Sequence, residues 1–298
     1  MRLPKQQWHS LLGGDTLADS LCHFSQADSL RHSYRKGNTM RKLVATVALI
    51  LLGTTLAMGG DATRKVLILC DEKPQMDVLA KRLTTDGYAV DFISTKEKLP
   101  ALDPAYAVVV FIHRVFPGDQ ADAVIRYTRG GGRLIVLHHS ISSAKVKTPQ
   151  WLKFVGVAVE KGDIQKGGYA WQEGVDLRLV NLAPNHYITT RNIQYKEKAE
   201  YKRSDVEEPV RQRDCVDFPD SEVYINHRFT DDKAKTVLFG FICQHPKLGE
   251  TVWMQDRGGW LKKAGKGWVF YFMPGHTVAE LENPIFQQVV MNCLTWNP

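Results

Sequence analysis

Continuous apolar runs separated by helical segments begin at residue 65, and this alternation constrains the fold more than any other feature of the chain. Four runs lack polar alternation, which is typical of strands buried on both faces, and they lie at 65–71, 88–94, 105–113 and 133–140. Two segments between them carry apolar residues at helical spacing and end at glycine. The pattern predicts an α/β fold, a flavodoxin-like three-layer sandwich with a mostly parallel sheet.

The remainder of the chain is less regular. A short helix is expected at 148–156. Residues 157–229 are rich in glycine, charged and aromatic residues, which predicts short strands and long loops packed over one end of the sheet. Strand-like and helical patterns then return, in the order 235–243, 249–257, 267–276 and the helix 283–296. We expect a single domain from 63 to 298.

The N-terminal region resembles a targeting segment. Arg41 and Lys42 follow Met40, an apolar run occupies 43–52, and small residues follow as far as Ala62. This is the layout of a secretory signal peptide at 40–62, so we expect export to the periplasm or the extracellular space and no stable membrane span after cleavage. An uncleaved anchor is the alternative. Because signal peptides begin a chain, residues 1–39 are interpreted as a non-native N-terminal extension.

Charge and cysteine content exclude some functions. The formal net charge is only +7 over 298 residues, with both signs mixed along the chain, and this does not indicate a nucleic-acid partner. Four cysteines follow residue 62. Those at 70, 243 and 293 lie in apolar runs, where a buried free thiol is the usual state, and the remaining one is Cys215. No C-x-x-C spacing occurs, so a cysteine zinc site is not expected.

Histidines stand where buried strands end. His113 follows one apolar run, His138 and His139 follow another, and His276 follows the run at 267–272. Because parallel strands share one carboxyl edge, these residues are expected at the same rim of the sheet, where ligands bind in such folds. Alternation along a strand predicts that His138 and His139 point to opposite sides. Ser140, directly after them, is a candidate substrate contact.

These segments carry a resemblance to a known family. The strand "GGGRLIVLHHS", the helix "PQWLKFVG", "APNHYIT", "AEY" and the closing "GKGWVFYFMPGHT…NPIFQQVVMNCLTW" resemble the ThuA-like trehalose-utilisation family. The resemblance covers 65–296 and implies a fold like that of class I glutamine amidotransferases, with sugars or sugar derivatives as ligands. The nucleophilic cysteine of those amidotransferases has no counterpart in "VLHHSIS", so glutaminase chemistry is not expected.

The resemblance also implies site residues. It places one family histidine on His138 or His139, with His138 in the better register, and two others on His186 and His276. It also places an acidic–Glu-x-Tyr step on Glu200 and Tyr201, and a Gly-His-Thr motif that includes Thr277. Three features depart from the family pattern. Tyr187 replaces a proline, Ala199 replaces an acidic residue, and no histidine follows in 157–168.

The expected chemistry is proton transfer by histidine and carboxylate. His138, His186, Glu200 and His276 are the candidate catalytic residues, and His113, His139, Ser140, Tyr201 and Thr277 are the candidate substrate contacts. Imidazole titrates near neutral pH, and His138, His186 and His276 are also candidate ligands for a zinc ion as cofactor. Trp171, Trp253 and Trp260 are candidate stacking surfaces for a sugar.

Two alternatives remain open. The first is a non-catalytic carbohydrate-binding or interaction domain that retains the fold, which the three departures favour. The second is a hydrolase with Ser140 as nucleophile, although the G-x-S-x-G context of such serines is absent. The oligomeric state is not predicted.

Overall fold

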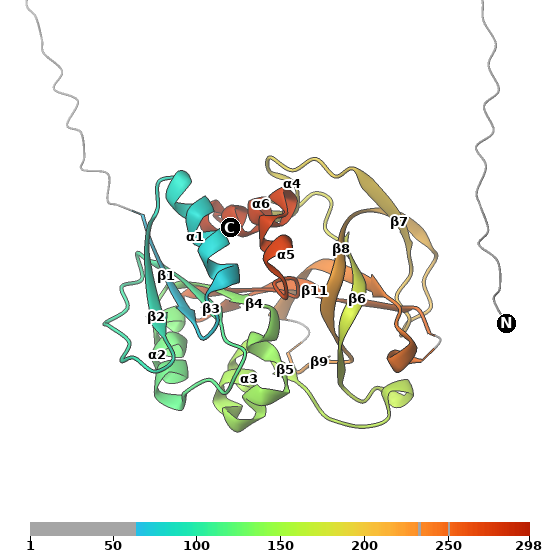
Figure 1. Ribbon diagram of the computed structural model, residues 1–298, viewed down its shortest axis with the longest axis horizontal. Helices are drawn as coiled ribbons and strands as arrows, with labels where there is room; N and C mark the ends of the chain where they lie inside the picture. Colours follow the sequence, from blue (N-terminus) through green and yellow to red (C-terminus); the bar gives the residue numbers. More distant parts are fainter. Residues whose placement is uncertain (1–63, 232–233, 250) are drawn as a thin grey trace, which may run out of the picture. The chain divides into compact units, whose positions relative to one another are not determined.

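One large mixed sheet organises the chain (Figure 1). The computed structural model describes residues 64–231, 234–249 and 251–298, so the predicted extension (1–39) and signal peptide (40–62) lie outside the described residues. The ten strands follow the order β2-β1-β3-β4-β12-β11-β10-β6-β8-β7. Among the described residues, no helix combines the length and apolar character needed to cross a membrane.

The first half of this sheet is parallel, as the sequence predicts. Its strands are β1 (Lys65–Cys70), β2 (Ala89–Ser94), β3 (Ala107–Phe111), β4 (Arg133–Leu137) and β12 (Gly267–Phe272). The order β2-β1-β3-β4-β12 corresponds to the 2-1-3-4-5 order of flavodoxin-like sheets, with the last strand supplied by the C-terminal part of the chain. Val108, Val109, Ile135 and Val136 are fully buried in it, because helices cover both faces.

The second half of the sheet is antiparallel, and the prediction of a mostly parallel sheet is wrong for it. Its strands are β11 (Trp253–Ala264), β10 (Lys235–Cys243), β6 (Ala170–Asn181), β8 (Arg211–Ile225) and β7 (Glu197–Tyr201). The region predicted as short strands and long loops thus contains the two long strands β6 and β8. Their charged residues obscured them, because an antiparallel sheet can leave one face in water.

Helices cover both faces of the parallel half (Figure 1). The elements are α1 (Pro74–Thr85), α2 (Gly118–Arg129), α3 (Pro149–Val155), α4 (Tyr187–Thr190), α5 (Val278–Glu282) and α6 (Pro284–Thr295). The helices α1, α5 and α6 lie on one face and α2 and α3 on the other, while α4 packs against α6. A separate pair, β5 (Val157–Ala158) and β9 (Arg228–Phe229), is antiparallel.

The four cysteines of the described residues are buried free thiols, as the apolar context predicts for Cys70, Cys243 and Cys293. Burial raises the pKa of the Cys70 thiol to about 11 and that of Cys243 to about 12. These thiols are therefore protonated at neutral pH and are not nucleophiles. None of the four is a candidate for the catalytic cysteine of the amidotransferases.

Candidate functional site

The structure brings four histidines together at the carboxyl ends of β3, β4 and β12. These strands run parallel and are neighbours in the sheet, so the residues that follow them share one edge. The ring centroids of His113 and His139 are 4.4 Å apart, those of His138 and His139 4.5 Å, and those of His138 and His276 5.4 Å. This edge is the candidate site.

His138 sits on a strained turn from strand to helix. The strand β4 ends at Leu137, His138 has φ 50°, and a short 3-10 helix occupies His138–Ile141. A non-glycine residue in this left-handed region is uncommon, and such residues are often found at functional sites. The expectation that His138 and His139 diverge is wrong, because the strand ends before them and strand alternation does not apply.

Gly275 lets the chain after β12 approach this turn. Its φ is 137°, and a Cβ at this position would lie 3.1 Å from the Cβ of His138 and 3.4 Å from the ring of Phe111. Only glycine combines this backbone conformation with such close contact. The Gly-His pair therefore places the imidazole of His276 beside that of His138.

His138, Glu222 and His276 form a histidine–carboxylate group. His138 is fully buried, and its Nδ1 donates to the carbonyl of Met273 at 2.7 Å. Its Nε2 lies 2.9 Å from Oε2 of Glu222, which also accepts a hydrogen bond from the Tyr224 hydroxyl at 2.7 Å. The Nδ1 of the partly exposed His276 lies 3.6 Å from the same oxygen.

The hydrogen bonds define the charges in this group. The carbonyl of Met273 can only accept a hydrogen bond, so Nδ1 of His138 carries a proton. The Nε2 atom of His138 faces the carboxylate of Glu222, which is also a hydrogen-bond acceptor. Burial alone would raise the pKa of Glu222, but hydrogen bonds from His138 and His276 hold it well below its ordinary value. The neighbouring Glu222 carboxylate in turn raises the pKa of His276. Glu222 is therefore a carboxylate that favours the protonated form of His276.

A capping box holds the loop that carries His276. Thr277 is the N-cap of α5 and accepts a hydrogen bond from the backbone N–H of Glu280 at 3.3 Å. The Oε2 of Glu280 accepts from the backbone N–H groups of Gly275 and His276, the latter at 2.9 Å. Thr277 was predicted to contact substrate, and its hydroxyl instead caps this helix. The Thr-x-x-Glu spacing in the sequence is the signal that could have identified Glu280.

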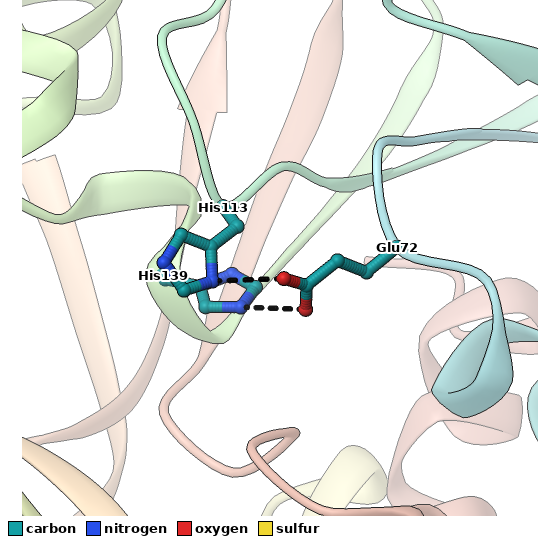
Figure 2. Close-up of side chains that lie close together, drawn as sticks. All are labelled: Glu72, His113 and His139. Atoms are coloured by element: carbon teal, nitrogen blue, oxygen red, sulfur yellow. Dashed lines mark ion pairs between the residues drawn. The ribbon is translucent and has the colours of Figure 1, made fainter.

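Glu72, His113 and His139 form a second group at the same rim (Figure 2). Glu72 follows β1, and its Oε1 lies 3.1 Å from Nδ1 of His113 and its Oε2 3.6 Å from Nε2 of His139. His139 is buried, whereas the side chains of His113 and Glu72 are 54% and 40% exposed. Burial and the neighbouring His138 and His113 hold the pKa of His139 far below its ordinary value, so His139 is neutral.

A hollow of about 150 Å³ lies between the two groups. His113 and His139 line it from one group and Glu222 and Tyr224 from the other, together with Trp171 and residues that include Glu173 and Ser142. The indole of Trp171 is exposed, unlike Trp253 and Trp260, which belong to the core. Of the three tryptophans considered in the sequence, Trp171 is the one positioned to contact a ligand.

His186 lies away from this site. Its Nδ1 accepts a hydrogen bond from the backbone N–H of Ile188 as the N-cap of α4, and its ring lies 5.6 Å from that of Trp296. Trp296 packs against Trp268, which pairs with Arg133 at the amino end of β4, opposite to His138. The structure therefore does not bring His138, His186 and His276 together, and Glu222 instead of His186 lies beside His138 and His276.

Glu200 and Tyr201 also lie outside the site. They belong to the edge strand β7, where Glu200 is exposed and pairs with Gln212, and Tyr201 is buried in a separate cluster with Val180 and Cys215. The spacing Glu-x-Tyr occurs at Glu222 and Tyr224, further along β8, and both residues are in the site. The motif was placed on the wrong segment, because "AEY" lacks the intervening residue.

Ser140 is a structural residue. Its buried hydroxyl donates to the carbonyl of Val110 at 3.0 Å and accepts from the backbone N–H of Ile112 at 3.0 Å. These bonds tie the turn after β4 to the end of β3. The hydroxyl is engaged and buried, so neither substrate contact nor nucleophilic attack by Ser140 is supported.

The fold and the rim define the class of this protein: a mixed α/β protein with histidine–carboxylate groups at the carboxyl ends of its parallel strands. A sequence model of the family described as "ThuA: Trehalose utilisation" matches residues 65–297. The chain belongs to this family. A search of curated proteins found no match.

Several solved structures are similar to this chain. A ThuA-like protein from Bacteroides uniformis is 18% identical, with 77% of this chain and 89% of that chain covered and a TM-score of 0.47. The carbohydrate deacetylase Agd3 is 14% identical at TM-score 0.48, over 78% of this chain and 32% of its own length. A protein described as a GMP synthase subunit, from Thermoplasma acidophilum, is 10% identical at TM-score 0.43, with 78% of this chain and 95% of that chain covered. Likenesses this distant carry no functional conclusion.

Proposed function

We propose that this protein is an exported, trehalose-utilisation-type protein that acts on a sugar or sugar derivative by histidine–carboxylate acid–base chemistry. The observation that carries the proposal is the group of His138, Glu222 and His276 beside a hollow. Glu222 lies 2.9 Å from the buried imidazole of His138 and 3.6 Å from the partly exposed imidazole of His276. Membership of the trehalose-utilisation family supports the substrate class.

The residues of this group have different roles in the proposal. His276 is the proton donor and acceptor toward a sugar oxygen, because it is partly exposed and Glu222 favours its protonated form. Glu222, which lines the hollow, supplies the negative charge that holds this proton. His138 is fully buried, so it is a positioning residue that acts through Glu222.

The test is turnover of trehalose, other disaccharides and their derivatives, followed by NMR. We expect His276→Ala and Glu222→Gln to lower turnover by about 10²–10⁴-fold, the usual contribution of general acid–base catalysis. Glu200→Gln is the matched carboxylate control and should leave turnover unchanged, since Glu200 is exposed on β7. Full activity in the folded His276→Ala variant would exclude the proposed role.

A non-catalytic carbohydrate-binding domain is the second candidate, favoured by the exposed indole of Trp171 at the hollow. Flat aromatic faces of this kind pack well against the apolar faces of sugars. A disaccharide that raises the melting temperature without being converted, and does so less in Trp171→Ala, would support this candidate. Turnover that disappears in His276→Ala would rule it out.

The proposal of export rests on residues 40–62 alone, with their basic start, apolar run and small-residue end. Expression of the full chain with its own N-terminus should yield a processed protein in the exported fraction. N-terminal sequencing should place the new terminus between residues 59 and 62. An intact N-terminus on a membrane-bound protein would favour the uncleaved anchor.

A further inference from the structure

Three potential metal ligands meet at the ends of three neighbouring parallel strands (Figure 2). Glu72 follows β1, His113 follows β3 and His139 follows the end of β4, and these strands are adjacent in the sheet. One ligand atom from each residue lies within 4.8 Å of the others. Two imidazoles and one carboxylate with a position left open are a common ligand set for catalytic zinc.

The distances within this group are compatible with coordination of one metal ion. Zinc bonds of about 2.1 Å at tetrahedral angles place two donor atoms about 3.4 Å apart. The observed separations from Glu72 oxygens, 3.1 Å to Nδ1 of His113 and 3.6 Å to Nε2 of His139, lie on either side of this value. The 3.6 Å between Oε2 of Glu72 and Nε2 of His139 is long for a hydrogen bond, as is the equal distance between Glu222 and His276 in the other group.

His139 has no hydrogen-bond partner for its second nitrogen either. Its side chain is only 5% exposed, and Nδ1 is buried without a partner among the described residues. A buried polar group without a partner destabilises a fold by about 1–3 kcal/mol. A cation at Nε2 would give a partner to the nitrogen that faces Glu72, and it would leave Nδ1 as it is.

The backbone that carries His113 is held from two sides. The Oδ1 and Oδ2 atoms of Asp71 accept hydrogen bonds from the backbone N–H groups of His113 and Arg114, at 2.7 and 2.8 Å. The buried Lys145 donates from Nζ to the carbonyls of Ile112 and His113, the latter at 2.7 Å. These contacts fix the direction in which His113 leaves β3, as preorganised ligand positions require.

The ligand atoms of His138, Glu222 and His276 also lie within 4.8 Å of one another, but hydrogen bonds already engage several of them. Both ring nitrogens of His138 are engaged, one by Met273 and one by Glu222, and the Glu222 oxygen also accepts from Tyr224. A metal ion there would have to replace hydrogen bonds that already satisfy these atoms. The Glu72 group has no comparable network among the described residues.

We propose that Glu72, His113 and His139 bind a divalent transition-metal ion of the zinc type. His113 and His139 also line the hollow next to Glu222, so an oxygen of a ligand in the hollow can reach the open coordination position. The metal site is independent of the acid–base role proposed for His276. Either proposal can fail without the other.

The test is metal binding by the full-length protein. After treatment with EDTA and removal of the chelator, calorimetric titration with Zn²⁺ should show one equivalent bound. Glu72→Gln and His113→Ala should each weaken Zn²⁺ binding by about 100-fold, since even the partners that orient metal ligands are worth about 10–100-fold in affinity. Both side chains are partly exposed, so these variants should fold, which circular dichroism verifies.

The matched control is His276→Ala, which removes a histidine from the other group. It should bind Zn²⁺ with the affinity of the unaltered protein. If His276→Ala loses Zn²⁺ while Glu72→Gln keeps it, the metal belongs to the other group and the proposal is wrong. Absence of Zn²⁺ binding, or equal binding of Mg²⁺, which prefers oxygen ligands, would also overturn it.

Discussion

The two histidine–carboxylate groups at the rim each contain two histidines and one glutamate, but they differ in the burial and hydrogen bonding of the carboxylate. In the group of His138, Glu222 and His276, the carboxylate is buried and accepts hydrogen bonds from His138 and from Tyr224. In the group of Glu72, His113 and His139, the carboxylate is exposed, and its contact with His139 is 3.6 Å long. A buried carboxylate with two short hydrogen bonds sets the charges of its group and favours proton transfer, whereas a partly exposed carboxylate beside an imidazole with an unpartnered nitrogen favours a cation.

The largest expected difference between the groups is in stability. Glu222→Ala should lower the free energy of unfolding by about 3 kcal/mol, because it removes one partner of a buried ionic hydrogen-bond network. Glu72→Ala should cost about 0.5 kcal/mol, since exposed ion pairs contribute little. Urea denaturation of both variants in metal-free buffer measures the two values. Equal costs would mean that the groups do not differ as described.

The second prediction concerns the close approach of the chain to His138. Gly275→Ala should destabilise the protein by about 2–3 kcal/mol, because it adds a close contact with His138 to the strain of a positive φ. Gly87→Ala is the matched control, with φ 86° and nothing within 4 Å of the added carbon, and should cost about 1 kcal/mol. Thermal unfolding of both variants tests the difference. A Gly275→Ala variant no less stable than Gly87→Ala would contradict the packing argument.

The third prediction uses the pH dependence of the Glu222 group. The pKa of His276 is raised in the folded protein by Glu222, with smaller contributions from Glu280 and Glu173. Its stabilisation is therefore complete below the unfolded pKa of about 6.5 and is lost as pH rises through the folded value. The stability advantage of the unaltered protein over His276→Asn should shrink with rising pH above about 6.5.

The Glu222 group should also affect stability at acid pH. The pKa of Glu222 is lowered, so its contribution is present above the unfolded value of about 4.3 and is lost as pH falls through the folded value. Urea midpoints measured across the pH range for the unaltered protein and His276→Asn isolate the His276 part. An advantage that stays constant across neutral pH would show that His276 and Glu222 are not coupled.

The smallest effects are expected at the residues that the structure separates from the rim. His186→Ala should cost about 1 kcal/mol, as for loss of an N-cap, and Glu200→Gln less than about 0.5 kcal/mol. Neither should change turnover or Zn²⁺ affinity. A large loss of turnover in His186→Ala would return this residue to the site and break the division into two groups.

The sequence by itself determined the parallel half of the sheet, its covering helices and the rim. Continuous apolar runs identify buried strands, and the shared direction of parallel strands brings the residues after them to one edge. His113, His138, His139 and His276 were found in this way. The buried state of Cys70, Cys243 and Cys293 followed from the same runs.

Only the tertiary structure decided the rest of the site. Glu222 comes from β8, a strand of the antiparallel half whose mixture of charged and apolar residues carries no clear periodic signal. Glu72 follows β1, so the rule that placed the histidines at the rim also applied to it, but only the structure shows that it meets His113 and His139. Local patterns report which faces are buried, but the meeting of side chains distant in the chain depends on how the long strands of the antiparallel half return to the rim. For that reason Glu222 was missed although the histidines were found.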